Sequence, residues 1–159
     1  MNDFTHIDEK GNPSMVDVSQ KQITHRTARA RSIVVLPKDV LDKFTGNDIQ
    51  TKKGSVFQTA IIAGIMAAKK TGELIPLCHP LGLDNCTINI RFNEDNELEI
   101  YCTASVTAKT GVEMEALVGA SIAALTVYDM CKALSHDIII KETMLIEKTG
   151  GKNDFKRAS

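Results

Sequence analysis

An acid and a base lie three residues apart in the second half of the chain, inside an otherwise apolar stretch. Asp129 and Lys132 occur in the segment VYDMCKAL, and residues at this spacing share one face of a helix. Charged side chains in an apolar helix are costly unless they are paired or functional. A partly desolvated lysine has a lowered pKa, which suits proton transfer near neutral pH. The spacing alone leaves a proton-transfer site and a buried structural ion pair equally open.

A histidine held between two prolines is the second candidate. The segment LIPLCHPL, residues 74–81, places Pro76 and Pro80 around Cys78 and His79. Proline fixes its own φ and favours extended backbone before it, so the loop holds the imidazole in place before any ligand arrives. An isolated histidine of this kind is more often structural than functional. Because Cys78 and His79 are adjacent and no second cluster has ligand spacing, we expect no metal site.

Two lysines precede a predicted helix in the segment TKKGS. Lys52 and Lys53 come directly before Gly54, where the helical pattern begins. A helix N-terminus offers free backbone N–H groups and a positive dipole end, which attract phosphate. The segment lacks the upstream glycine of a P-loop, so it is not a Walker motif. Two lysines on a turn, taken alone, are more often a solvated surface.

The long apolar helix also carries acids at its beginning. Glu113, Met114 and Glu115 follow Gly111, and the simple explanation is that acids there complement the helix dipole. Glu115 and Asp129 are 14 residues apart, or ~21 Å along a helix. One small ligand cannot easily contact both ends in one chain. If both ends are functional, the natural solution is a site built from two chains.

The elements that must position these residues follow from periodicity. Alternating residues predict strands, and apolar residues at helical spacing predict helices. A hairpin is indicated where two alternating segments flank the sequence NEDN, which is a typical turn composition. We expect strands at about 23–36, 87–92, 98–106 and 138–147, and helices at about 37–44, 54–70 and 112–134.

This order of elements predicts an α+β fold. It is the ferredoxin-like βαββαβ pattern, in which helices pack on one face of a four-stranded antiparallel sheet. We expect a single domain over residues 1–159, since 159 residues suffice for one core. Both ends, about 1–20 and 149–159, are rich in polar residues and glycine, so we expect them to be flexible.

Composition limits the possible classes of protein. A net charge of −1 argues against a general nucleic-acid binder. The N-terminus has no secretory signal, and no apolar run approaches the ~20 residues that span a bilayer. We therefore expect no membrane association and a cytoplasmic location. The four cysteines show no framework spacing, so we expect free thiols.

Four segments together resemble one known family. KKGSVFQTAIIAGIMAAKKTGELIPLCHPL, TGVEMEAL, LTVYDMCKAL and EKTGGKNDF are similar to signature segments of the molybdenum cofactor biosynthesis protein C family, the cyclic pyranopterin monophosphate synthases. The resemblance implies a ferredoxin-like subunit in a homohexamer, a trimer of dimers with active sites at the dimer interface. It implies no cofactor, and leaves open whether magnesium accompanies the triphosphate of the substrate.

The resemblance also implies a reaction. A radical SAM partner enzyme would make 3',8-cyclo-7,8-dihydro-GTP from GTP, and this chain would convert it to cyclic pyranopterin monophosphate with release of diphosphate. By position, the family's catalytic residues correspond to Asp129, Lys53 and Lys132. The implied substrate-binding residues are Leu77, Cys78, His79, Glu113, Met114, Glu115, Arg26 and Lys148. Which lysine would act as acid and which as base is left open.

Two other classes compete with this enzyme. Ferredoxin-like sheets bind RNA in many proteins through exposed aromatic residues on their central strands. Here aromatic residues make up 4% of the chain, tryptophan is absent, and the hairpin offers only Tyr101 on its polar side. A purely structural oligomer would not explain charges set into an apolar helix.

Overall fold

The centre of the fold is a five-stranded antiparallel sheet. The computed structural model describes residues 3–46 and 48–158. The strands lie in the order β4-β5-β1-β6-β7, and each pairs antiparallel with its neighbours. Their bounds are β1 Thr24–Val35, β4 Asn85–Phe92, β5 Leu98–Ala108, β6 Ile139–Thr149 and β7 Phe155–Lys156.

The predicted hairpin is confirmed as β4 and β5. Ile88 pairs with Cys102 and Ile90 pairs with Ile100, so the alternating apolar residues face the same side. The side chain of Asn93 closes the turn, since its Oδ1 accepts hydrogen bonds from backbone N–H groups two and four residues later, at 3.0 and 2.8 Å. A side chain that bonds nearby backbone in this way favours a turn over a continued strand.

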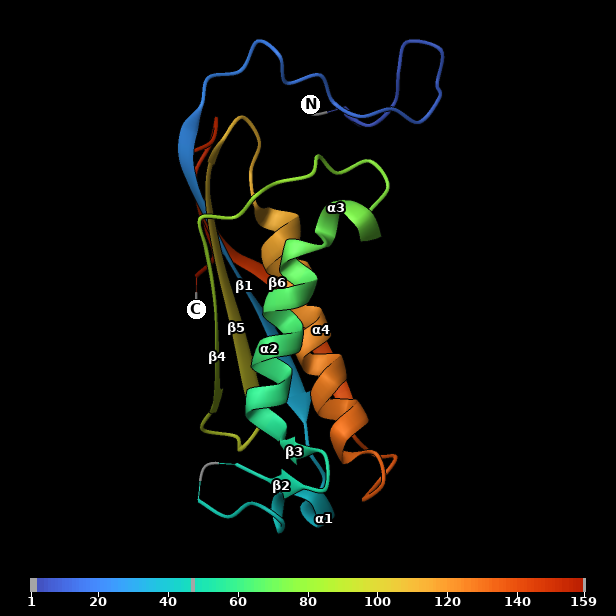
Figure 1. Cartoon of the computed structure of the whole chain (residues 1–159), viewed down its shortest axis with the longest axis vertical. Helices are drawn as coiled ribbons and strands as arrows, with labels where there is room; N and C mark the ends of the chain where they lie inside the picture. The colour runs from blue at the N-terminus through green and yellow to red at the C-terminus, as the bar shows by residue number, and fades with distance from the viewer. Residues whose placement is uncertain (1–2, 47, 159) are drawn as a thin grey trace.

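Two helices cover one face of the sheet (Figure 1). They are α2, Val56–Lys69, and α4, Glu113–Cys131. Both are rich in alanine where they pack, and these small side chains let helix and sheet approach closely. The resulting core lies between the helices and the sheet, and burial of its apolar surface stabilises the fold. Its fully buried members include Val34, Leu98, Ile100, Ala120, Ala123 and Val127.

The α+β prediction is confirmed, but the prediction of four strands is wrong. The fifth strand, β7, forms where the tail turns back and pairs with β6, with Glu147 opposite Lys156. It lies in the segment for which the sequence predicted flexibility. Four other short elements differ from the prediction. Helix α1, Lys38–Leu41, is shorter than the helix expected at about 37–44. The other three were not predicted: β2 Gln50–Thr51, β3 Gly54–Ser55 and α3 Thr71–Leu74.

The helix-free face of the sheet is polar and carries Tyr101. The Tyr101 side chain is covered by Arg29 and Arg91, whose guanidinium carbons lie 4.1 and 5.0 Å from the ring centre. Only 7% of this residue is exposed. An aromatic ring in this position is not available for base stacking, so the RNA-binding alternative loses the one aromatic residue on which it depended.

Helix α4 is more apolar than the sequence analysis allowed. It has 19 residues and is apolar enough, by length and composition, to cross a membrane. The expectation that no apolar run approaches this length is therefore corrected. The helix packs against α2 and the sheet, with Ala116, Ala120, Ala124 and Val127 fully buried. A buried core helix meets the same criteria.

Candidate functional site

The predicted site residues form two clusters at opposite ends of α4. One end holds Glu113, Met114 and Glu115, and the other end holds Asp129. The two ends are 14 residues apart, or ~21 Å along the helix axis. The arrangement agrees with the expectation that one chain cannot bring all of these side chains to one small ligand.

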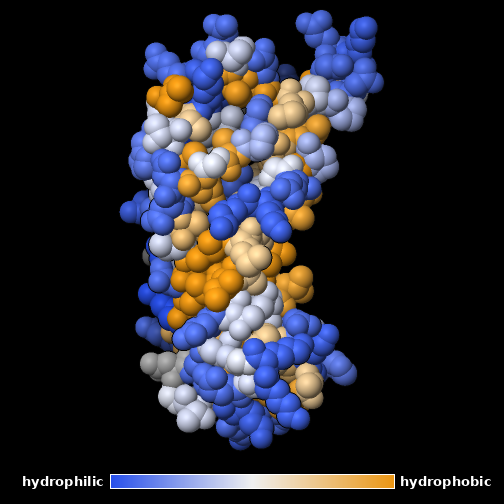
Figure 2. All heavy atoms as spheres, in the orientation of Figure 1, coloured by the Kyte–Doolittle hydropathy of each residue, from blue (hydrophilic) through white to orange (hydrophobic). Residues whose placement is uncertain are grey.

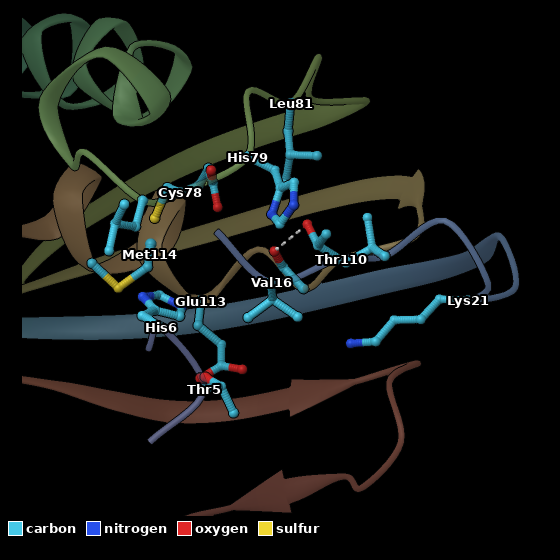
Figure 3. Close-up of a pocket in the computed structure, with 14 residues that line it drawn as sticks. Thr5, His6, Val16, Lys21, Cys78, His79, Leu81, Thr110, Glu113 and Met114 are labelled. Atoms are coloured by element: carbon cyan, nitrogen blue, oxygen red, sulfur yellow. Dashed lines mark hydrogen bonds between the residues drawn. The ribbon is translucent and has the colours of Figure 1, made fainter. Parts of the chain in front are cut away.

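The first cluster lines a cavity of about 360 Å³, which we call the loop cavity. The loop after α3 and the beginning of α4 contribute to it. Figure 3 shows His79 and Glu113 approaching the same space from different elements. Six predicted substrate-binding residues line this cavity together: Leu77, Cys78, His79, Glu113, Met114 and Glu115.

Short-range packing fixes the loop that carries His79. The buried Thr71 Oγ1 donates a hydrogen bond of 2.9 Å to the Ala68 carbonyl at the beginning of α3. Pro80 packs so closely on Gly72 that a Cβ at residue 72 would lie 3.0 Å from the Pro80 Cα. The loop is thus held against α3 at Pro80, the residue after His79, which limits the positions open to the imidazole.

Two groups that line the loop cavity have raised pKa values. Glu115 is only 3% exposed, and burial raises the pKa of its carboxyl group. The pKa of the Cys78 thiol is also raised, mainly by burial and then by the charge of Glu115. A buried carboxyl with a raised pKa can remain protonated and donate a hydrogen bond.

A second cavity of about 210 Å³ adjoins the first, and we call it the cationic cavity. The two cavities share Lys21, Gly111 and Glu113. The single carboxylate among its lining residues, Glu113, accepts a hydrogen bond of 2.8 Å from Lys148 Nζ. The cations that line it are Lys21, Arg26, Lys148 and Lys152. This excess of positive charge suits a bound anion such as a phosphate chain.

One wall of the cationic cavity depends on a glycine after β6. Gly150 has a φ of +88°, and a Cβ there would strike the backbone carbonyl of His25. Thr24 Oγ1 donates a hydrogen bond of 2.7 Å to the Gly150 carbonyl, which ties the turn to the beginning of β1. Arg26 Nε donates to the Ala108 carbonyl at 3.2 Å. These bonds fix the backbone that presents Arg26 to the cavity.

The second cluster, which we call the lysine cluster, consists of Lys53, Asp129 and Lys132. Lys132 Nζ lies 3.0 Å from Asp129 Oδ1, and Lys53 Nζ lies 3.7 Å from Oδ2. The hydrogen bond from Lys132, followed by the charges of both lysines, lowers the pKa of Asp129. Lys53 comes from the β2–β3 turn, so the cluster joins that turn to the end of α4.

The environment of this cluster differs from the sequence-based expectation. Within one chain the side chains of Asp129, Lys132 and Lys53 are 52%, 55% and 68% exposed. They form neither a buried ion pair nor a desolvated lysine site in the single chain. The surrounding apolar residues had suggested burial, but these charged side chains point away from the core.

The helix N-terminus beside Lys53 is not open to phosphate. The N–H of Val56 donates to the Ile49 carbonyl at 3.0 Å. The next two N–H groups donate to Asp48 Oδ1 at 3.1 Å and to Ser55 Oγ at 3.2 Å. Because these groups already satisfy the first turn of α2, the backbone anion site that the sequence left open is replaced by a capped helix.

Within residues 3–46 and 48–158, no three or more His, Cys, Asp or Glu side chains gather closely enough to hold a metal ion. All four cysteines are free thiols: Cys78, Cys86, Cys102 and Cys131.

Comparison with known proteins identifies the family. The MoaC family model matches residues 15–151, a span that includes both ends of α4 and the loop with His79. The chain belongs to the MoaC family. The match contains all eleven predicted site residues, and it ends before Lys152 of the cationic cavity. Residues 3–14, which include Thr5 and His6, precede it.

Individual relatives of this family cover nearly the whole chain. A cyclic pyranopterin monophosphate synthase of Xanthomonas campestris is 53% identical over 155 residues, covering 98% of this chain and 94% of the relative. One of Staphylococcus carnosus is 50% identical over 162 residues, covering 100% and 99%. A molybdenum cofactor biosynthesis bifunctional protein of Synechocystis is 57% identical over 158 residues; the match covers 97% of this chain but only 46% of that longer protein.

The structure adds residues that the sequence analysis did not single out. They come mainly from the segment before β1, together with one lysine of the tail. A weak sequence signal is the spacing of Val16 and Val18 on either side of Asp17, which is typical of extended chain lying on a surface. The added lining residues include Thr5, His6, Val16, Val18, Lys21 and Lys152.

Proposed function

We propose that this chain is a cyclic pyranopterin monophosphate synthase of molybdenum cofactor biosynthesis. Its substrate is 3',8-cyclo-7,8-dihydro-GTP, and its products are cyclic pyranopterin monophosphate and diphosphate. The observation that carries the proposal is the junction of two cavities, one rich in cations and one containing His79 and buried Glu115. The names of the relatives supply the product, cyclic pyranopterin monophosphate, and the substrate and the departing diphosphate follow from the family resemblance of the sequence.

The cationic cavity binds the triphosphate. Lys21, Arg26, Lys148 and Lys152 provide four positive charges against the one carboxylate of Glu113. Charge-assisted hydrogen bonds from lysine and arginine to phosphate oxygens are about twice as strong as neutral ones. The same cations stabilise the negative charge that develops on the departing diphosphate.

The loop cavity binds the guanine-derived part of the substrate. Glu115 contacts the heterocycle from the wall of this cavity, where burial raises the pKa of its carboxyl group. His79 donates to a phosphate oxygen or carries a proton between groups. Leu77, Cys78 and Met114 form the remaining walls and orient the ring.

The lysine cluster of a second chain completes each site. Asp129 and Glu115 are ~21 Å apart along one helix, so the catalytic groups must come from a partner copy. The surface of α2 and α4 supports such packing, because Ile62, Met66 and Leu125 are 59%, 49% and 52% exposed. Figure 2 shows apolar side chains over the middle of these helices. An exposed apolar patch of this kind is typical of an interface.

In this assembly two copies of α4 run antiparallel about a two-fold axis, so that each lysine cluster meets the partner's loop cavity. Three such dimers form the homohexamer, and the four long strands with α2 and α4 form a ferredoxin-like unit to which β7 is added. A two-fold interface of this kind uses the same patch on both copies.

The chemistry divides among the residues as follows. A ribose-derived hydroxyl attacks the phosphorus that remains in the product, and the bond to the diphosphate breaks. Opening the guanine-derived ring and closing the pterin ring require protons to be added and removed. Asp129, Lys53 and Lys132 move these protons and contact the reacting atoms once the partner chain covers them. The chain needs no cofactor of its own, and magnesium enters only as a companion of the triphosphate.

The substrate comes from a radical SAM partner enzyme in the cytoplasm. The longer relatives are named as a molybdenum cofactor biosynthesis bifunctional protein and a molybdenum cofactor biosynthesis protein. Fusion of a domain like this chain to further sequence would keep an unstable intermediate near the enzyme that uses it. No membrane or nucleic acid takes part.

A coupled assay tests the proposal. The partner enzyme generates the cyclic nucleotide from GTP in place, this chain is added, and diphosphate and the fluorescent oxidised pterin are measured. We expect both products to appear only when this chain is present. Consumption of the cyclic nucleotide with no diphosphate, or no consumption at all, would overturn the proposed function.

A further inference from the structure

The segment before β1 forms part of both cavities. We call residues 3–22 the N-terminal arm. Five of the fourteen lining residues of the loop cavity come from this arm, and Lys21 lines the cationic cavity as well. Figure 1 shows the arm crossing the end of the molecule that carries α3 and the beginning of α4. The arm is therefore a wall of the substrate site.

The base of the arm has an inward and an outward side. Val16 and Val18 are half-buried and line the loop cavity. Met15, which precedes them, and Asp17, which lies between them, are exposed. This alternation is that of extended chain lying on a surface. The two valines anchor the base of the arm and fix the direction from which Lys21 enters the site.

The tip of the arm is organised by its own hydrogen bonds. Asp8 Oδ1 accepts from the backbone N–H groups of Lys10 and Asn12 at 2.9 and 2.8 Å. The N–H of Ser14 donates to the His6 carbonyl at 2.9 Å. The tip therefore moves as a unit, and this unit carries His6, whose ring lies beside Met114 and Thr5 in Figure 3.

Few bonds tie the arm to the body. Between residues 3–22 and the other described residues, the single hydrogen bond is 3.4 Å long, from Lys109 Nζ to the Ser19 carbonyl. Most arm residues are exposed. A segment with few buried contacts and few bonds opens at low cost. The arm can thus move away from the body to admit a substrate and then close over the bound substrate.

Lys21 is an unpaired cation at the junction of the cavities. Within the described chain no carboxylate lies within 4.0 Å of its ammonium group. The nearby Glu113 is already paired with Lys148 at 2.8 Å. Figure 3 shows the Lys21 side chain extending toward this junction. An unpaired ammonium group here is free to bind a phosphate oxygen.

We propose that Lys21 and His6 contact the substrate and that the N-terminal arm closes over it. Lys21 binds the phosphate nearest the ribose, because it alone among the cations lines both cavities. His6 hydrogen-bonds to the nucleoside part in the loop cavity. This inference rests on the proposed function and adds two substrate contacts from outside the folded core.

The test compares variants of the full-length chain. Lys21→Ala and His6→Ala are each assayed for diphosphate release and titrated with GTP as a probe of the empty site. For Lys21→Ala we expect KM and the Kd for GTP to rise about 10-fold or more, since charge-assisted hydrogen bonds have this strength. The salt dependence of GTP binding should weaken too, and Lys21→Arg should restore most of the affinity.

Lys10→Ala is the matched control. Lys10 lies on the same arm but lines neither cavity, so its variant should keep KM and Kd. If wild type makes no diphosphate, the proposed function fails. If wild type is active while Lys21→Ala and His6→Ala both keep KM and Kd within about twofold, the proposed role of the arm is overturned and the proposed function stands.

Discussion

Gly64 of α2 and Gly119 of α4 face each other where the two helices cross. A Cβ at Gly64 would lie 2.8 Å from the Gly119 carbonyl oxygen, and a Cβ at Gly119 would lie 3.3 Å from the Gly64 carbonyl oxygen. The contact brings the two helix backbones together. It thereby fixes α4, the element that carries functional candidates at both of its ends.

The first prediction concerns this crossing. Gly119→Ala should lower the free energy of unfolding by about 1–3 kcal/mol, because the added methyl group must push against the Gly64 backbone and the Cys102 side chain. Urea denaturation measures the change. Gly82→Ala is the control, since nothing lies within 4 Å of a Cβ there. Equal stability of both variants would mean that the helices do not approach this closely.

The second prediction concerns the lysine cluster. Lys53→Ala, Lys132→Ala and Asp129→Asn should each abolish diphosphate release while leaving the free energy of unfolding nearly unchanged, because exposed ion pairs contribute little to stability. Lys38→Ala removes a comparable exposed pair, 2.8 Å from Asp42, and should leave turnover intact. Normal diphosphate release by Lys53→Ala or Lys132→Ala would contradict the catalytic assignment.

The third prediction follows from the composite site. His79→Ala and Lys132→Ala chains should each be inactive alone. When they are unfolded together and refolded, a mixed dimer contains one site with an intact His79 and an intact Lys132, and another site that lacks both. We expect diphosphate release to reappear in the mixture. Its continued absence, with mixed dimers verified by mass spectrometry, would argue that each site uses one chain only.

The fourth prediction concerns the pH dependence of stability. The pKa of Glu115 is raised above its ordinary value of 4.5 in the folded state. Wild type therefore loses stability as pH rises from the unfolded-state pKa to the folded-state pKa, and the loss is constant above that. Glu115→Gln should be more stable than wild type at pH 7, with the advantage disappearing at low pH.

Urea denaturation at several pH values measures this difference. Glu9→Gln is the matched control, because Glu9 is exposed and loses the same charge without relieving burial. A Glu115→Gln advantage that is the same at every pH would refute the assignment of a buried carboxyl with a raised pKa.

Much of the fold was predictable because the apolar residues of its longer elements recur at regular spacing. The β4–β5 hairpin and the strand through Ala28 and Ala30 alternate strictly, and alternation is the pattern of a half-buried strand. The short elements have no such signal. Two-residue strands such as Phe155–Lys156 and the four-residue helix Thr71–Leu74 form because the surrounding fold brings backbone groups together, which local sequence does not encode.

The candidate site was predictable in part. The prolines around His79 and the acids near Gly111 are local features, and the structure brings them to one cavity. Residues such as His6 and Lys21 are polar residues in a polar segment, so only the path of the arm reveals their position. The exposure of Asp129 and Lys132 was also unpredictable, because both lie among apolar neighbours but on the outward side of α4.

The length of α4 has a consequence for how this protein must be handled. If its two ends belong to different active sites, specific activity depends on the amount of protein in the assay, since dilution separates the copies by mass action. A preparation that works at high concentration would lose turnover per chain at low concentration, with every chain still folded. Catalytic activity would then depend on the equilibrium between separated and associated chains.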